Sequence, residues 1–188
     1  MRPSLRRIAL LLAGLPLLAQ APSREAPPWG AGFVLGQDQG PSDRPYGTVQ
    51  GVEVTWSFLR DHWVQGRLRG TVLDVGKGPG TLPALGQPPL SGRFLVASCD
   101  WIFRFQKAHG PYFLLGAGLN GHQVRRDWPG AADQASGVNM AASAGVGFLA
   151  VNRWEVELRW DTLVVDMAPV WGPSRDAKPL VVAARMRY

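Results

Sequence analysis

The residues from Trp154 to Trp160, WEVELRW, alternate large apolar side chains with charged ones over the length of one strand. A repeat of two residues is typical of a β-strand whose two faces meet different surroundings. Further stretches of this kind recur along the chain with Gly- and Pro-containing turn signals between them, and no window has a sustained helical period. The pattern predicts an all-β chain of eight strands, at residues 29–36, 48–59, 63–75, 93–105, 112–124, 138–150, 153–163 and 179–188.

The gaps between these strands alternate in length. The long ones are residues 37–47, 76–92, 125–137 and 164–178, and the short ones are residues 60–62, 106–111 and 151–152. An up-and-down barrel in an outer membrane has this rhythm, because its periplasmic turns are short and its extracellular loops are long. We therefore expect an eight-stranded antiparallel up-and-down transmembrane β-barrel. A soluble periplasmic β-domain is the alternative.

The first 21 residues differ from the rest of the chain. Three arginines near the start precede an apolar run at residues 8–19, and Ala19-Gln20-Ala21 forms a small-x-small site. This is the layout of a cleaved secretory signal peptide, and the apolar run is too short to span a bilayer. We divide the chain into a signal peptide at residues 1–21, a short Pro-rich lead at 22–28 and a barrel domain at 29–188.

Composition adds two constraints. Removal of the signal peptide lowers the formal net charge from +6 to +3, and no run of basic residues marks a nucleic-acid surface. Cys99 is the only cysteine, so no disulfide within the chain can form. Closing the sheet on itself is another source of stability for a small exported domain, because a closed sheet has no unpaired edge.

Charged residues gather on one face of the predicted strands. In WEVELRW the apolar side chains share one side, and Glu155, Glu157 and Arg159 share the other. In a membrane barrel the apolar side faces lipid and the charged side faces the interior. An eight-stranded barrel is just wide enough for side chains to fill, so we expect the charges to pair internally. This predicted ion network consists of Glu53, Arg67, Arg69, Asp100, Arg104, Glu155, Glu157, Arg159, Asp161, Arg185 and Arg187.

The last strand, LVVAARMRY, has apolar residues at every second position up to a terminal aromatic residue. These positions are Leu180, Val182, Ala184, Met186 and Tyr188. The strand resembles the C-terminal signature that the outer-membrane barrel assembly machinery recognises, although a terminal Phe is commoner there than Tyr. Aromatic residues near the predicted short turns fit an interfacial girdle: Trp63, Phe103, Phe105, Phe113, Trp154 and Tyr188.

The chain after the signal peptide resembles the small eight-stranded bacterial outer-membrane β-barrel family. The stretches YFLLGAGLNG and ASAGVGFLA, and the WEVELRW that follows them, are similar to the Gly-spaced strands and the charged closing strand of such domains. The resemblance implies a porin-like transmembrane fold in the outer membrane of a Gram-negative bacterium. It does not assign a role, because the family includes anchoring, adhesion, lipid-modifying and unassigned members.

Some eight-stranded barrels are lipid A-modifying enzymes, and those that remove acyl chains use a His-x-Ser dyad on a strand. No His-x-Ser occurs here, and His62 and His109 fall at predicted periplasmic turns. His122 lies near the extracellular end, where it could approach Ser136 or Asp127. We expect His122 to be an ordinary polar residue and the chain not to be an enzyme. Without metal-ligand spacing among the histidines and Cys99, we expect no metal or cofactor.

Arg125 and Arg126, at the predicted membrane edge, are candidates for contact with lipopolysaccharide phosphates, because a guanidinium group matches phosphate geometry. Solvated loop charges are the alternative. The expected partners are outer-membrane lipid, lipopolysaccharide and the barrel assembly machinery, and the sequence indicates no external ligand. We predict a structural function, a small closed barrel that presents four loops outside the cell. The alternatives are a narrow pore or ligand-binding barrel and a lipid A-modifying enzyme.

Overall fold

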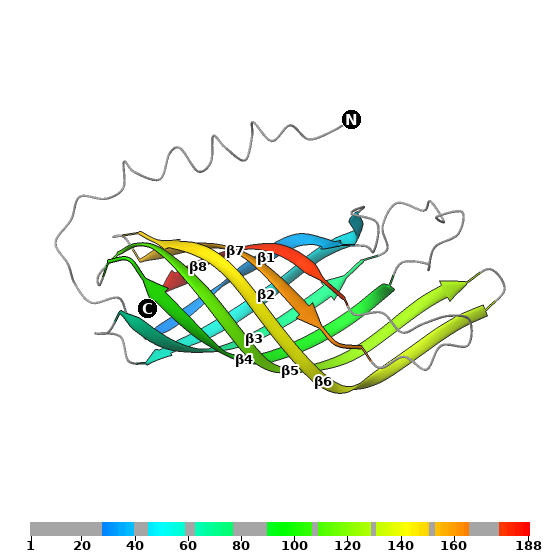
Figure 1. Ribbon diagram of the computed structural model, residues 1–188. Helices are drawn as coiled ribbons and strands as arrows, with labels where there is room; N and C mark the ends of the chain where they lie inside the picture. Colours follow the sequence, from blue (N-terminus) through cyan, green and yellow to red (C-terminus); the bar gives the residue numbers. More distant parts are fainter. Residues whose placement is uncertain are drawn as a thin grey trace, which may run out of the picture.

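A computed structural model describes residues 28–39, 45–58, 63–76, 90–106, 109–128, 131–150, 153–165 and 177–188. The strands are β1 (Trp29–Gln39), β2 (Pro45–Phe58), β3 (Val64–Val75), β4 (Leu90–Arg104), β5 (Gly110–Trp128), β6 (Ala131–Leu149), β7 (Trp154–Leu163) and β8 (Pro179–Arg187). Each strand pairs antiparallel with the next and β1 pairs with β8, so the sheet closes into a barrel (Figure 1). The predicted eight-stranded antiparallel fold is confirmed. The predicted signal peptide, residues 1–21, lies outside the described residues.

The two ends of the barrel differ in their connections. At the turn end, residues 59–63, 105–109 and 150–153 join successive strands, and β1 begins and β8 ends there. At the opposite loop end, the joining residues are 40–44, 76–89, 129–130 and 164–178. Two of these four connections are as short as the turns, so the expectation of four long loops is wrong. No helix among the described residues is long and apolar enough to cross a membrane.

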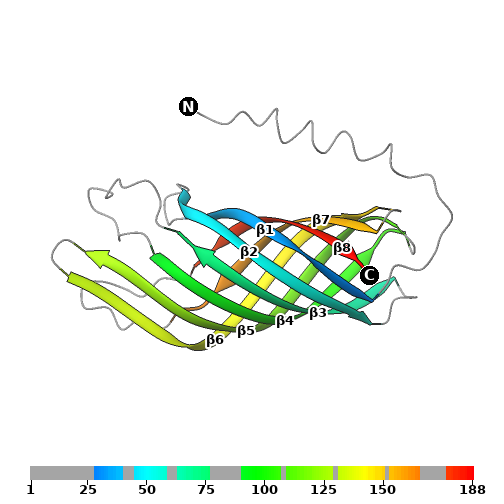
Figure 2. The same ribbon diagram turned by 180° about the vertical axis from the view of Figure 1, so that it is seen from behind.

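The predicted third loop, residues 125–137, is instead the outer part of a β-hairpin. Arg125 pairs with Gln134 and Arg126 with Asp133, and the ladder continues to Trp128 and Ala131. Both views show β5 and β6 reaching beyond the other strands at the loop end (Figures 1 and 2). Where both faces of a strand meet water, the ladder needs no alternation of apolar and polar residues. The sequence pattern therefore gave no sign of these strand ends.

The alternation in WEVELRW corresponds to the inside and the outside of the barrel. Glu155, Glu157 and Arg159 are fully buried, whereas Trp154 and Trp160 remain about half exposed. The charged face therefore points into the barrel and the apolar face points outward. The same two-residue period separates inward from outward side chains on the other strands, so the outer wall is apolar over most of its height.

Glycines on the inner face make room for the interior side chains. A Cβ atom added at Gly147 would overlap the Tyr112 ring, and one added at Gly116 would overlap the Asp100 carboxylate. In β1, Gly32 and Gly36 also face inward, where the backbone of β8 leaves no space for a Cβ atom. Strand β1 continues to Gln39 although its glycines weaken the strand pattern, because Asp38 still pairs with Gly47 of β2 and with Pro179 of β8.

Candidate functional site

The turn-end half of the interior holds a cluster of charged side chains, which we call the ion cluster. Strand β7 contributes four of them, because residues two apart along a strand share one face. The other members come from β2, β3, β4 and β8. All of them are buried: Glu53, Arg67, Arg69, Asp100, Glu155, Glu157, Arg159, Asp161, Arg185 and Arg187.

Arg67 on β3 bridges opposite walls of the barrel. Its Nη2 donates to Asp100 Oδ2 on the neighbouring strand at 2.8 Å. The same guanidinium reaches across to β7, where Nη1 donates to Glu155 at 2.9 Å and Nη2 to Glu157 at 2.9 Å. One planar fork with several donors can serve three carboxylates, which a lysine ammonium could not do in this geometry.

Arg185 and Arg159 complete the centre of the cluster. Arg185 donates to Glu53, to Glu155 at 2.9 Å and to Glu157 at 2.6 Å. Arg159 donates to Glu157 at 2.8 Å, to Asp161 at 2.9 Å and to Glu53 at 3.2 Å. Each of these two arginines therefore contacts carboxylates on more than one strand, and the cluster ties the barrel wall together across its interior.

Neutral side chains and the remaining bases fill the edges of the cluster. The Tyr112 hydroxyl donates to Glu155, and its oxygen also lies 2.9 Å from Glu157 Oε2. Arg69 donates to Asp100 at 3.0 Å and to Ser143 at 2.8 Å, and Arg187 donates to Glu155 at 2.8 Å. These contacts join β5, β6 and β8 to the same set of carboxylates.

The structure brings ten of the eleven predicted network residues together in these contacts. The eleventh, Arg104, is half-buried at the turn end of the same inner face, within electrostatic range of Glu155 and Arg187. Removing one partner from a buried ion pair costs about 3–5 kcal/mol, because the other charge is left uncompensated. Such a cluster therefore holds its strands in one register.

The loop-end half of the interior is filled mainly by apolar side chains, which the sequence reasoning missed; Asp38, Asn120 and His122 are buried polar residues beside them. The members of this apolar cluster are almost completely buried: Val34, Val49, Leu73, Val75, Phe94, Val96, Val124, Ala141, Leu163, Val165, Ala177, Val181 and Ala183. A signal was present, because consecutive apolar residues such as Val72-Leu73 and Val181-Val182 break the alternation. Such runs indicate strands that are apolar on both faces.

The last strand and the aromatic residues face outward. Leu180, Val182 and Tyr188 are exposed, and Ala184 and Met186 are half-buried on the same face; their recognition by assembly machinery stays a prediction. The predicted girdle residues Trp63, Phe103, Phe105, Phe113 and Trp154 all lie at the turn end. Trp29, Trp56 and Trp101 also lie on the outer wall. The Phe103 and Phe113 rings stack with their centroids 4.6 Å apart.

His122 does not form a catalytic arrangement with Ser136. His122 faces inward, where its Nδ1 lies 3.0 Å from Asn120 Oδ1 and its ring is near Phe94. Ser136 is on the outward face of β6, because β6 pairs Gly137, not Ser136, with His122. The side chain of Asp127 and all of His62 lie outside what the structure describes. Within the described residues, no group of three or more His, Cys, Asp or Glu side chains is arranged to hold a metal ion.

Polar residues occupy the outward face at the loop end of β2 to β5. Arg93 donates to Asp74 at 3.1 Å, and both side chains are largely exposed. Arg125 also points outward and is exposed. For Arg126 the structure describes the backbone only, which pairs with Leu90 and Asp133. The two predicted lipopolysaccharide contacts are therefore neighbours of an arginine, Arg93, that the sequence reasoning did not select.

No protein-family model matches the chain, and no curated protein sequence is similar to it. Solved structures are similar in fold. The N-terminal β-barrel domain of Pseudomonas aeruginosa OprF superposes with a TM-score of 0.56 at 12% identity, over 87% of this chain and 100% of that one. Ail, the attachment invasion locus protein of Yersinia pestis, in complex with the heparin analogue sucrose octasulfate, gives a TM-score of 0.52 at 10% identity. The match covers 85% of this chain and 96% of that one.

Neisserial surface protein A gives a TM-score of 0.50 at 11% identity, over 85% of this chain and 96% of that one. All three are small outer-membrane barrels, and the present chain spans nearly their whole length. The chain therefore has the fold of the small eight-stranded outer-membrane β-barrels.

Proposed function

We propose that this chain is a sealed barrel of the bacterial outer membrane that acts as a scaffold and presents its loop-end segments outside the cell. The observation that carries the proposal is the filling of the interior by two stacked clusters. The ion cluster occupies the turn-end half, and the apolar cluster occupies the loop-end half. An interior packed in this way favours a closed barrel whose function resides in its outer surface.

The outer wall supports a membrane location. Large apolar side chains are exposed around the barrel, including Phe33 at 70% and Leu95 at 60%. Monomeric soluble proteins rarely expose contiguous apolar patches of this kind. The aromatic residues at the turn end match the interfacial girdle of transmembrane barrels. These features favour a membrane barrel over a soluble periplasmic domain.

The remaining parts of the proposal follow from the sequence. Residues 1–21 direct export as a cleaved signal peptide. The outward positions of β8 that end at Tyr188 are the contact for the outer-membrane assembly machinery. Lipid and lipopolysaccharide surround the wall, and no external ligand is assigned to the loops. With this orientation the turn end faces the periplasm and the loop end faces the outside.

No specific observation favours either of the two alternative functions, a narrow pore or a lipid A-modifying enzyme. A narrow pore requires a continuous water-filled path, and fully buried apolar residues such as Val34, Leu73 and Phe94 fill the loop-end half instead. A lipid A-modifying enzyme requires an activated nucleophile or base near the outer leaflet. His122 is instead enclosed beside Asn120 and Phe94.

The first test is location and closure. The full-length chain is expressed in a Gram-negative host, and outer membranes are compared boiled and unboiled by gel electrophoresis. We expect a membrane-retained band whose mobility shifts on heating, and no stepwise conductance in planar bilayers. A soluble periplasmic chain without a shift would refute the membrane barrel. Regular open-channel steps would refute closure.

The second test is orientation. Cys99 is replaced by Ala, and a new cysteine is placed either at the exposed Ser136 on β6 or at the exposed Gln106 at the turn end. Intact cells are treated with a maleimide that does not cross membranes. We expect Ser136→Cys to react in intact cells and Gln106→Cys to react only after lysis. The reverse pattern would overturn the orientation.

A further inference from the structure

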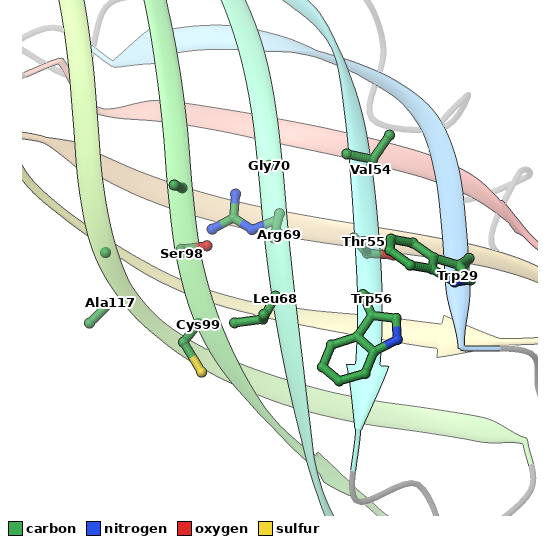
Figure 3. Close-up of a pocket in the computed structure, with 12 residues that line it drawn as sticks. Trp29, Val54, Thr55, Trp56, Leu68, Arg69, Gly70, Ser98, Cys99 and Ala117 are labelled. Carbon is green, nitrogen blue, oxygen red and sulfur yellow. The ribbon is translucent and has the colours of Figure 1, made fainter.

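The outer wall of β2 to β5 carries a groove at mid-height (Figure 3). The groove has a volume of about 590 Å³. The wall is hollowed there because small outward residues meet: Gly70 pairs with Ala97, and Cys99 pairs with Ala117. Larger side chains from β1, β2 and β3 form its rims: Trp29, Val54, Trp56 and Leu68.

The same four strands carry a second, polar depression at the loop end. Thr48, Gln50, Asp74, Arg93 and Gln123 line this head pocket, which has a volume of about 460 Å³. Within this lining, Arg93 Nε lies 3.1 Å from Asp74 Oδ1, and both side chains are largely exposed. On β5, the exposed Arg125 lies two residues beyond Gln123 on the same outward face. The head pocket is therefore polar, and two arginines lie in or beside it.

The outward residues at the loop end of β6 to β8 are of both kinds. Val138 and Met140 are each 70% exposed, and Val164 and Leu180 are 36% and 38% exposed, whereas Gln134, Ser136 and Lys178 are exposed polar residues. The wall of β2 to β5 differs because Arg93 and Gln123 line a pocket that lies directly along the same strands from the groove.

The spacing along β4 places the two depressions at different depths. Arg93 and Phe103 both face outward, ten residues apart. Ten residues at about 3.3 Å each, tilted by roughly 40°, give about 25 Å, the height of the apolar band of a membrane barrel. Arg93 therefore lies at the head-group border. Ala97 lies about 13 Å farther along the strand, within the hydrocarbon layer.

We propose that this wall is a binding site for one phosphorylated glycolipid of the outer leaflet, lipopolysaccharide. A phosphate is held at Arg93 and Arg125 with the amides of Gln50 and Gln123, and an acyl chain lies along the strands into the groove. Charge complementarity selects the head group, because arginine matches phosphate geometry. The site rests on the proposed membrane location, but it adds a defined lipid to the partners named there.

A second copy of the barrel fits this surface less well than an acyl chain. A barrel wall is convex, and the tryptophan rings of Trp29 and Trp56, with centroids 6.4 Å apart, stand at the rim of the groove. A single flexible chain enters such a groove, whereas a second convex wall would contact only the rims. A copy placed here would also bury the Arg93–Asp74 pair at a cost in desolvation.

The test measures lipopolysaccharide retained per barrel by native mass spectrometry after purification from outer membranes in mild detergent. Arg93→Gln removes the head contact, and Ala97→Phe fills the groove. We expect each variant to lower the retained lipopolysaccharide about tenfold, the effect of losing one charge-assisted hydrogen bond or a comparable contact. Ala97→Leu, a smaller filling change, replaces Ala97→Phe if that variant does not assemble.

Two matched controls separate the site from general effects. Ala184→Phe adds the same ring on the outward face of β8, and Arg153→Gln removes an exposed arginine at the turn end. Both should retain lipopolysaccharide like the unchanged protein. All variants should keep the heat-dependent mobility shift, so a failure of the lipid site is distinguishable from a failure of the barrel.

Four results would overturn the proposal. Equal retention in all variants means that no defined site exists. Equal losses in the controls mean that binding is nonspecific. A loss in Ala97→Phe alone means that the groove takes an acyl chain without head recognition. A dimer of the unchanged protein that Ala97→Phe converts to a monomer means that a second copy occupies the wall.

Discussion

The ion cluster and the apolar cluster of the barrel interior are equally buried but chemically opposite. A smaller apolar group, Ile102, Leu114 and Leu149, lies beside the ion cluster at the turn end. The turn-end half contains charged side chains from β2, β3, β4, β7 and β8, and the loop-end half contains the apolar cluster. Each half fills the same narrow bore. A small barrel can therefore be filled in two ways. One depends on directional contacts between specific partners, and the other depends mainly on volume.

This difference has consequences for substitution. In the ion cluster, Glu157 accepts hydrogen bonds from Arg67, Arg159 and Arg185, so a change at one position affects several strands. In the apolar cluster, contacts are nondirectional, and another apolar side chain of similar size satisfies them. The two halves should therefore respond differently to changes of similar size.

The largest effect is expected from Arg185→Met. The substitution keeps much of the side-chain length but leaves Glu53, Glu155 and Glu157 without a shared partner. The free energy of unfolding from lipid vesicles, measured by urea titration, should fall by about 3–5 kcal/mol. Arg153→Met, at an exposed turn position, is the control and should have little effect. A loss as small as that of the control would contradict the central place of Arg185.

Leu158→Arg should have the next largest effect, because Leu158 is on the outward face in the middle of β7. A charge facing lipid near the midplane costs about 2–4 kcal/mol and falls to about 0–1 kcal/mol near the interface. Val164→Arg, near the loop end, is therefore the graded control. The yield of assembled, heat-shifted barrel measures both variants. Similar yields would mean that the outer wall does not face lipid.

A smaller effect is expected from Leu73→Met in the apolar cluster. Leu73 is fully buried, yet a volume-conserving apolar exchange usually costs less than about 1.5 kcal/mol. The urea titration used for Arg185→Met provides the comparison directly. A cost for Leu73→Met as large as that for Arg185→Met would mean that the two clusters do not differ in their tolerance of substitution.

The smallest effect is expected from Gln134→Lys in the outer part of the β5–β6 hairpin. Gln134 is exposed and belongs to neither interior cluster, although the adjacent Ala135 packs against the apolar one. Exposed substitutions of this kind usually change the free energy of unfolding by less than about 0.5 kcal/mol. The heating temperature at which mobility changes should equal that of the unchanged protein. A clear decrease would show that the hairpin contributes to barrel closure.

The sequence predicted the features that a two-residue period controls. The number of strands, their antiparallel order and the outward and inward faces follow from alternation, and WEVELRW is the clearest case. The alternation also placed Arg67, Glu155 and Arg185 on one face, but it did not predict which carboxylate each arginine contacts. Those partners depend on the shear of the closed sheet, which sets the side chains of β3 opposite those of β7.

The features that the sequence did not predict are those without alternation. The apolar cluster was not predicted because its residues, such as Val181 and Leu73, have apolar sequence neighbours on the outer face. The outer part of the β5–β6 hairpin was not predicted because residues 125–137 combine charged residues with Gly137. This composition indicates a loop when a strand is recognised by its alternation of apolar and polar residues. The head pocket was not predicted because Gln50, Arg93 and Gln123 come from three strands. Only the pairing register of those strands brings them together.

The inward glycines have a consequence for the history of this sequence. Gly147 lies against the Tyr112 ring, and Gly116 lies against the Asp100 carboxylate. Neither glycine can acquire a side chain while its large neighbour stays in place. In related sequences, the two members of each pair should therefore change together: a larger residue at position 147 should accompany a smaller one at position 112. Correlated substitution of this kind would record the limited width of the bore as an evolutionary constraint.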